Sequence, residues 1–191
     1  KGSDLATIVY TSGSTGTPKG VELTHANFVF ITYSGVNSMP DIAMKPNRRL
    51  LLFLPLAHVF ARYMQFFCFA GNVSLGLSSN LKTILADFKA FKPTFILAVP
   101  RIFEKIYNAA SQKAGAGFKG RVFADATQTA CDWSHAQQSG GSIPLALNAK
   151  HALYNKLVYS SIMEVFGGHV EYAVSGGAPL DSSIAHFFNG V

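Results

Sequence analysis

The sequence predicts an α/β fold with a mainly parallel sheet flanked by helices. Short apolar runs that suit strands alternate along the chain with runs of helical periodicity. These runs are almost continuously apolar, as in strands that are covered on both faces. The segments between them are long enough to hold a crossover helix, which a parallel connection requires. Hydrophobic residues make up 49% of the 191 residues, which is ample for a packed core.

The first part of the chain follows this alternation closely. The expected strands are residues 6–11 (ATIVYT), 49–56 (RLLLFLPL), 72–77 (NVSLGL) and 94–99 (TFILAV). The first expected helix, residues 24–35, begins at Thr24, whose hydroxyl can cap it. An apolar helix is expected from about Val59 to Ala70. The next helix presents one face through Leu81, Ile84, Leu85 and Phe88 and ends at Lys92-Pro93.

The second part of the chain is dominated by helices. Pro100 occupies a position where the first turn of a helix accepts proline. Residues 118–166 carry no strand pattern, and they predict two helices separated by the turn SGGSIP, with Gly167-Gly168 ending the second. Residues 170–180 (VEYAVSGGAPL) predict a last strand that runs into a glycine turn. Asp181 can then cap a final helix.

The composition narrows the class of protein. The formal charge of +6 suits a phosphorylated ligand or an anionic membrane surface, and nucleic acid is not expected because no dense basic patch is present. The apolar run 50–71 contains Arg62, so a buried strand and helix are expected there rather than a membrane span. Cys68 and Cys131 are expected to be buried reduced thiols, which favours the cytoplasm. The chain shows no secretory signal, lacks an initiator Met and ends abruptly, so we expect a piece of a longer protein.

The run YTSGSTGTPKG, from Tyr10 to Gly20, points to phosphate binding. Its glycines let the backbone turn its amide groups toward an anion, and its hydroxyl groups and Lys19 add further donors. A Walker loop is excluded because Lys19 stands between Pro18 and Gly20, and the dinucleotide pattern G-x-G-x-x-G is also absent. A flexible linker is the alternative, but a linker seldom separates a strand from a helix. We therefore expect a polyphosphate ligand.

The same run resembles the phosphate-loop signature of the adenylate-forming superfamily, which includes acyl-CoA synthetases, luciferases and peptide-synthetase adenylation domains. Residues 54–60 (LPLAHVF), 92–107 (KPTFILAVPRIFEKIY) and 172–180 (YAVSGGAPL) extend the resemblance. Long-chain fatty-acid CoA ligases are the most similar branch, and the helical segment at about 115–168 supports that choice. The resemblance implies that residues 1–191 form one incomplete part of an N-terminal domain like that of acetyl-CoA synthetase, without the C-terminal domain.

The resemblance also implies a reaction and a set of site residues. A carboxylate attacks the α-phosphate of ATP, pyrophosphate leaves, and coenzyme A then attacks the acyl adenylate. His58 would lie close to the carboxylate. The β- and γ-phosphates would be held by Thr11, Ser12, Gly13, Ser14, Thr15, Gly16, Thr17, Pro18, Lys19 and Gly20. The adenosine would lie against Ser175, Gly176, Gly177, Ala178 and Pro179. The glutamate that binds Mg²⁺ and the late catalytic lysine of the family would lie outside these residues, so we expect this chain alone to be inactive.

Several alternatives remain open at this stage. The parent protein could act on medium-chain or aryl acids, or the chain could be a noncatalytic ATP-binding module. Without its motif, His58 is as compatible with a core position as with a site. Phe60, Tyr63 and Phe66 suit either plain core or an apolar tunnel. Ala61 stands before Arg62 where the family often has an acidic residue. Fatty acid, ATP and coenzyme A are the expected partners, in the cytoplasm, with peripheral membrane contact left open.

Overall fold

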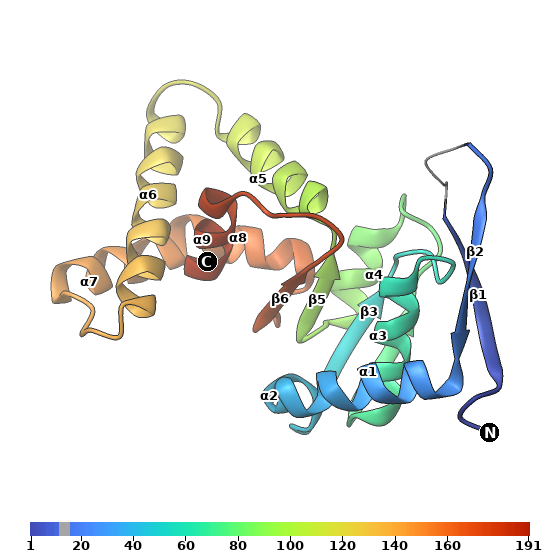
Figure 1. Ribbon diagram of the computed structural model, residues 1–191. Helices are drawn as coiled ribbons and strands as arrows, with labels where there is room; N and C mark the ends of the chain where they lie inside the picture. The colour runs from blue at the N-terminus through green and yellow to red at the C-terminus, as the bar shows by residue number, and fades with distance from the viewer. Residues whose placement is uncertain (12–15) are drawn as a thin grey trace. The chain divides into compact units, whose positions relative to one another are not determined.

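The computed structural model describes residues 1–11 and 16–191 (Figure 1). Contacts between residues divide the chain into two compact units. The first unit comprises Lys1–Ile84 with Pro93–Ile96, and the second comprises Leu85–Lys92 with Leu97–Val191. The prediction that all 191 residues belong to one partial domain stays a prediction.

The first unit begins with a hairpin that the sequence did not predict. Strand β1 (Leu5–Thr11) pairs antiparallel with β2 (Lys19–Thr24), and Thr11 lies opposite Lys19. These two strands form a sheet of their own (Figure 1). The expectation that the glycine-rich run leads from a strand directly into a helix is therefore wrong, because β2 lies between them. Residues 21–24 alternate apolar and polar side chains, which is the period of a strand.

Three helices complete the first unit: α1 (His25–Ser38), the short α2 (Pro40–Ala43) and α3 (Val59–Ala70). Thr24 caps α1 as predicted, since its hydroxyl accepts from the amide of Asn27 while the Asn27 side chain accepts from the amide of Thr24. Helix α3 has the predicted bounds. It packs on α1 through Phe28 and Phe66, whose ring centroids are 4.7 Å apart.

The predicted parallel sheet is confirmed, and its strands follow one another in the order β4-β3-β5-β6. The four strands are β3 (Arg48–Leu52), β4 (Val73–Leu77), β5 (Phe95–Ala98) and β6 (Tyr172–Ser175). Strand β3 runs parallel to β4 along its whole length and to β5 at Leu50 and Phe95. Leu50, Leu51 and Leu52 are all buried, which explains the unbroken apolar run.

The second unit is mainly helical, as predicted. It contains α4 (Ile84–Phe91), which begins at the last residue of the first unit, and α5 (Pro100–Ala114) and α6 (Phe118–Gln138). After the predicted turn come α7 (Leu145–Tyr154), the π-helical η1 (Asn155–Tyr159), α8 (Ser160–Met163) and the 3₁₀ turn η2 (Glu164–Phe166). Gly167 ends this run in the left-handed region, and Asp181 caps α9 (Ser182–Gly190).

The core of the second unit lies where α6, η1, α8 and α9 meet. Its buried members are Phe123, Ala126, Ala130, Tyr159, Ile162 and Phe187. Helices α6 and α9 approach so closely that a side chain at Gly190 would place its Cβ 2.1 Å from the carbonyl oxygen of Ala130. The hydroxyl of Tyr159 donates to the carbonyl oxygen of Ala126 at 2.7 Å. The small residues at this crossing therefore set the distance between the two helices.

Two further expectations concern the burial of the cysteine thiols and the presence of a membrane-spanning helix. Cys68 is buried, and its burial raises the pKa of the thiol to about 12. Cys131 is also a free thiol but only half-buried, so the expectation that both thiols are buried is wrong for this one. Within residues 1–11 and 16–191, no helix has both the length and the apolar character needed to cross a membrane.

Candidate functional site

The hairpin between β1 and β2 carries the predicted phosphate-binding run. Ser12, Gly13, Ser14 and Thr15 lie outside the described residues. The described members, Thr11 and residues 16–20, are all exposed, and the Thr11 hydroxyl donates to the carbonyl oxygen of Lys19 at 3.5 Å. Gly16 has a φ of 81°, a conformation that side-chain-bearing residues seldom adopt, and open space surrounds it. The described part of the run therefore presents accessible backbone and the Lys19 ammonium group.

His58 has a structural role that the sequence did not reveal. It directly precedes α3, and its ring Nδ1 accepts a hydrogen bond from the amide of Phe60 at 3.2 Å. The imidazole thus caps the helix. His58 is exposed, which does not fit a core histidine. Because Nδ1 accepts, the neutral ring carries its proton on Nε2, and that N–H can donate to a carboxylate.

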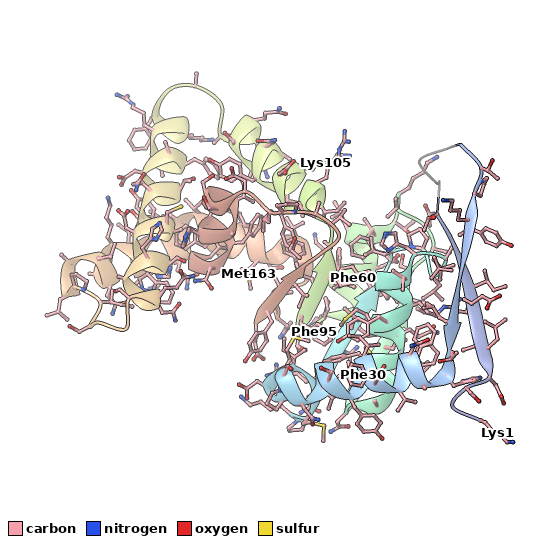
Figure 2. The ribbon with its side chains drawn as sticks, in the orientation of Figure 1. Lys1, Phe30, Phe60, Phe95, Lys105 and Met163 are labelled. Carbon is pink, nitrogen blue, oxygen red and sulfur yellow. The ribbon has the colours of Figure 1, made fainter. Side chains whose placement is uncertain are left out.

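The neighbouring aromatic residues of α3 pack within the first unit. Phe60, Tyr63 and Phe66 are all half-buried, and Figure 2 shows Phe60 on α3. Phe66 contacts Phe28 of α1, and burial raises the pKa of the Tyr63 phenol. Phe66 packs on α1, and the tunnel interpretation of Phe60, Tyr63 and Phe66 stays a prediction. The guanidinium group of Arg62 donates a hydrogen bond to the side-chain oxygen of Gln65 at 3.2 Å. Its partner is therefore a neutral residue one turn further along α3.

The second predicted segment follows β6 in the second unit. The amide of Gly176 donates to the carbonyl oxygen of Ala98 at 3.4 Å, which ties the turn to the end of β5. Ala178 and Pro179 are exposed. The hydroxyl of Ser175 is buried and has no hydrogen-bond partner within the described part of the chain. Buried hydroxyls nearly always have a partner, so Ser175 is an exception to that rule.

A cavity of about 860 Å³ lies beside this turn. Arg101, Glu104 and Lys105 of α5 line it together with Ala178 and Pro179. Arg101 and Lys105 are exposed and stand one helical turn apart, near the positive end of α5. Figure 2 labels Lys105 on this helix. Two cations against one carboxylate suit a ligand that carries phosphate. The sequence analysis identified the turn but assigned no site residue to α5, although the sequence shows two cations at i and i+4 just after a strand.

The structure brings the predicted site residues together in two groups. Residues 11–20 and His58 belong to the first unit, and residues 175–179 belong to the second. The first group offers a lysine and an imidazole. The second offers small residues, an unpaired hydroxyl and a cavity with two cations. Within the described residues, no cluster of three His, Cys, Asp or Glu side chains is arranged to hold a metal ion.

The chain belongs to the family of AMP-binding enzymes, whose sequence model matches residues 1–191. It is 46% identical over 190 residues to the long-chain-fatty-acid CoA ligase FadD15 of Mycobacterium tuberculosis. It is 34% identical over 189 residues to long chain acyl-CoA synthetase 3 of Arabidopsis thaliana. The alignments take in 100% and 97% of this chain, but only 31% and 28% of these relatives.

Solved structures support the fold. The A-PCP didomain of a carboxylic acid reductase from Segniliparus rugosus, in complex with AMP, superimposes with a TM-score of 0.61 at 25% identity. The match covers 97% of this chain and 22% of that one. The adenylation domain of a carboxylate reductase from Mycobacterium chelonae gives the same TM-score at 23% identity, over 97% of this chain and 25% of that one. The helices and the mainly parallel sheet are therefore those of an adenylation domain.

Proposed function

We propose that this chain is part of an ATP-dependent long-chain fatty-acid CoA ligase that forms an acyl adenylate, releases pyrophosphate and then makes acyl-CoA. The observation that carries the proposal is the match of 46% identity along the whole chain to a protein named as such a ligase. The geometry is compatible with it, because the described hairpin and turn carry groups that bind phosphate and nucleoside. ATP, Mg²⁺ and coenzyme A are the small molecules this activity needs.

The hairpin between β1 and β2 would hold the β- and γ-phosphates of ATP. Charge on a leaving pyrophosphate is best stabilised by donors that are already in position, and lysine and backbone amides are such donors. Lys19 is held at the start of β2, opposite Thr11. Its ammonium group supplies the positive charge of this hairpin, while Gly16 adopts a positive φ that suits a tight turn.

The segment 175–179 would lie against the adenosine. Ala178 and Pro179 carry little bulk, so a flat purine can approach the backbone closely. The unpaired hydroxyl of Ser175 offers one polar contact to that nucleoside. Arg101 and Lys105, across the same cavity, would contact a phosphate-bearing part of a ligand. His58 would orient the fatty-acid carboxylate through the N–H of its Nε2.

The other candidate functions find less support. The curated relatives named above are long-chain enzymes, which disfavours a medium-chain or aryl-acid ligase and a noncatalytic module. The described residues contain no cluster of three His, Cys, Asp or Glu side chains that could bind Mg²⁺. The family resemblance implies that the glutamate that binds Mg²⁺ lies in a segment outside residues 1–191. We also propose that the protein works in the cytoplasm.

The proposal is tested with the full-length protein in a pyrophosphate-release assay over a panel of carboxylates. We expect turnover with long-chain fatty acids in the presence of ATP, Mg²⁺ and coenzyme A. Turnover on acetate or amino acids alone would overturn the long-chain assignment. The 191 residues by themselves should form no detectable acyl adenylate, because adenylation depends on several positioned groups acting together.

The phosphate role is tested by Lys19→Ala. Loss of one charge-assisted hydrogen bond predicts a fall in kcat/KM for ATP of about 5- to 150-fold, corresponding to roughly 1–3 kcal/mol. Lys19→Arg is the matched control, because it keeps the charge at the start of β2 and should retain more activity. Gly16→Val should be more damaging than Lys19→Ala, since valine does not tolerate the positive φ. Wild-type ATP kinetics in both Lys19→Ala and Gly16→Val would exclude the hairpin as the phosphate site.

A further inference from the structure

The start of α5 lies beside the turn that is proposed to bind adenosine. Helix α5 begins directly after β5, and Val99 is the one residue between them. The amide of Gly176 donates to the last residue of β5 at 3.4 Å, and a Cβ built on Gly177 would lie 3.8 Å from a methyl group of Val99. Arg101 is the second residue of α5, so it follows directly on the segment that contacts the turn.

The charged side chains of the cavity between α5 and the turn sum to one positive charge. Arg101, Glu104 and Lys105 line it from one face of α5, and the remaining lining residues are uncharged. In the part of the chain that the structure describes, none of these three side chains forms a hydrogen bond or an ion pair. The phosphodiester of an adenylate carries one negative charge, whereas the β- and γ-phosphates of ATP carry about three between them. The cavity therefore suits the α-phosphate better than the terminal phosphates.

The covalent structure of ATP points to the same phosphate. Its α-phosphate is attached to C5′ of the adenosine, so it must lie close to wherever the nucleoside binds. The cavity of about 860 Å³ has Ala178 and Pro179 on its lining together with the two cations, and that volume is typical of a site for a small ligand. The β- and γ-phosphates have a separate proposed site on the hairpin that carries Lys19. The α-phosphate is thus the group left for the cations of α5.

We propose that Arg101 and Lys105 bind the α-phosphate of ATP and hold the same phosphate in the acyl adenylate, an inference that rests on the function proposed above. In the adenylation step an oxygen of the fatty-acid carboxylate forms a bond to the α-phosphorus. The bond from that phosphorus to the bridging oxygen breaks, and pyrophosphate leaves with the electron pair. Because the α-phosphate stays on the adenosine, the cations contact it before and after the step. The planar fork of Arg101 suits two phosphate oxygens, and Lys105 adds a point charge.

The test compares the binding of AMP and of adenosine to the full-length protein by titration calorimetry, since these ligands differ only in the phosphate concerned. Arg101→Gln and Lys105→Gln should each lower the affinity for AMP about tenfold and leave the affinity for adenosine unchanged. Glu104→Gln removes the negative charge of the cavity and should raise the affinity for AMP by up to about fivefold. Circular dichroism should show that all three variants are folded.

Lys113→Gln is the matched control, because Lys113 is an exposed lysine of α5 that does not line this cavity. It should bind AMP and adenosine like the wild type. Lys19→Ala should weaken the binding of ATP but not of AMP, because its proposed contact is with the terminal phosphates. This pattern would distinguish the two phosphate sites from each other.

Unchanged AMP affinity in both Arg101→Gln and Lys105→Gln overturns the proposal. Equal losses for AMP and adenosine also overturn it, because they would show that these residues only support the fold of the turn. A raised KM for coenzyme A with normal AMP affinity would assign the cations to that substrate instead. A wild-type protein that releases pyrophosphate and binds AMP leaves the proposed function standing in each of these cases. A wild-type protein that does neither contradicts the proposed function itself.

Discussion

His58 should contribute to stability and to catalysis through different atoms of one ring. Nδ1 accepts the Phe60 amide at the start of α3, while Nε2 is the atom that can reach a carboxylate. Replacement by asparagine places an acceptor where Nδ1 stands but nothing where Nε2 stands. Replacement by alanine removes both. Comparison of His58→Asn with His58→Ala therefore separates the two roles.

The structure sets the size of each effect. Loss of a helix cap costs about 0.5–2 kcal/mol, and an exposed cap with a 3.2 Å bond belongs near 1 kcal/mol. A change of that size lowers the melting temperature by about 2–4 °C in a protein of about 200 residues, and by less in the longer full-length protein. Loss of a hydrogen bond to a charged carboxylate costs about 1.5–3 kcal/mol, or about 10- to 150-fold in kcat/KM. His58→Ala should show both losses, and His58→Asn should show only the second.

Two measurements on the full-length protein check this. Thermal unfolding reports the cap, and pyrophosphate release at varied fatty-acid concentration reports the site. His58→Gln is a third variant, because its amide reaches the position of Nε2 and should recover part of the activity. If His58→Asn kept wild-type kcat/KM, the imidazole would serve only as a cap and the assignment of His58 to the site would be wrong. Equal melting temperatures for His58→Ala and the wild type would refute the capping argument.

Three further predictions concern the second unit and the thiols. Gly190→Ala should destabilise the fold by roughly 1–3 kcal/mol in urea unfolding, because its Cβ would meet the carbonyl oxygen of Ala130. Cys131 should react with an alkylating thiol reagent in the native state well before Cys68, whose burial raises its pKa to about 12. The pKa of Asp181 is lowered, first by the hydrogen bond from a serine hydroxyl and then by two amides at the start of α9. Its stabilising effect is present above the unfolded-state pKa and is lost as the pH falls through the lowered one, so Asp181→Asn should flatten the acid limb of a melting-temperature profile.

The sequence predicted those elements whose signals are local. Helix α3 has the bounds that the apolar run between two strands suggested, and Thr24 and Asp181 cap helices as their positions indicated. Continuous apolar runs such as residues 50–52 predicted buried parallel strands, which the structure contains. These features depend on residues that are near one another in the chain, and for that reason pattern and propensity are sufficient to predict them.

The missed features depend on contacts that the sequence does not display. Strand β2 is short and exposed, and it exists because it pairs with β1, so the run from Lys19 to Thr24 looked like a continuation of the loop. The positions of Arg101 and Lys105 gained meaning only when α5 was found beside Ala178 and Pro179, more than 70 residues later in the chain. The cap at His58 was missed because histidine is an uncommon capping residue. In each case a pairing between segments, rather than a local preference, decided the structure.

The unpaired hydroxyl of Ser175 connects the fold to its proposed function. A buried polar group without a partner costs about 1–3 kcal/mol, and folded proteins avoid that cost almost everywhere. Within the described residues only Thr32, Trp133 and Ser175 carry such side-chain atoms, and of these only Ser175 belongs to the predicted nucleoside-binding turn. The hydroxyl stands at the end of β6, where the strand's own hydrogen bonds end and the turn begins. The proposed nucleoside, bound against Ala178 and Pro179, would give this hydroxyl a hydrogen-bond partner.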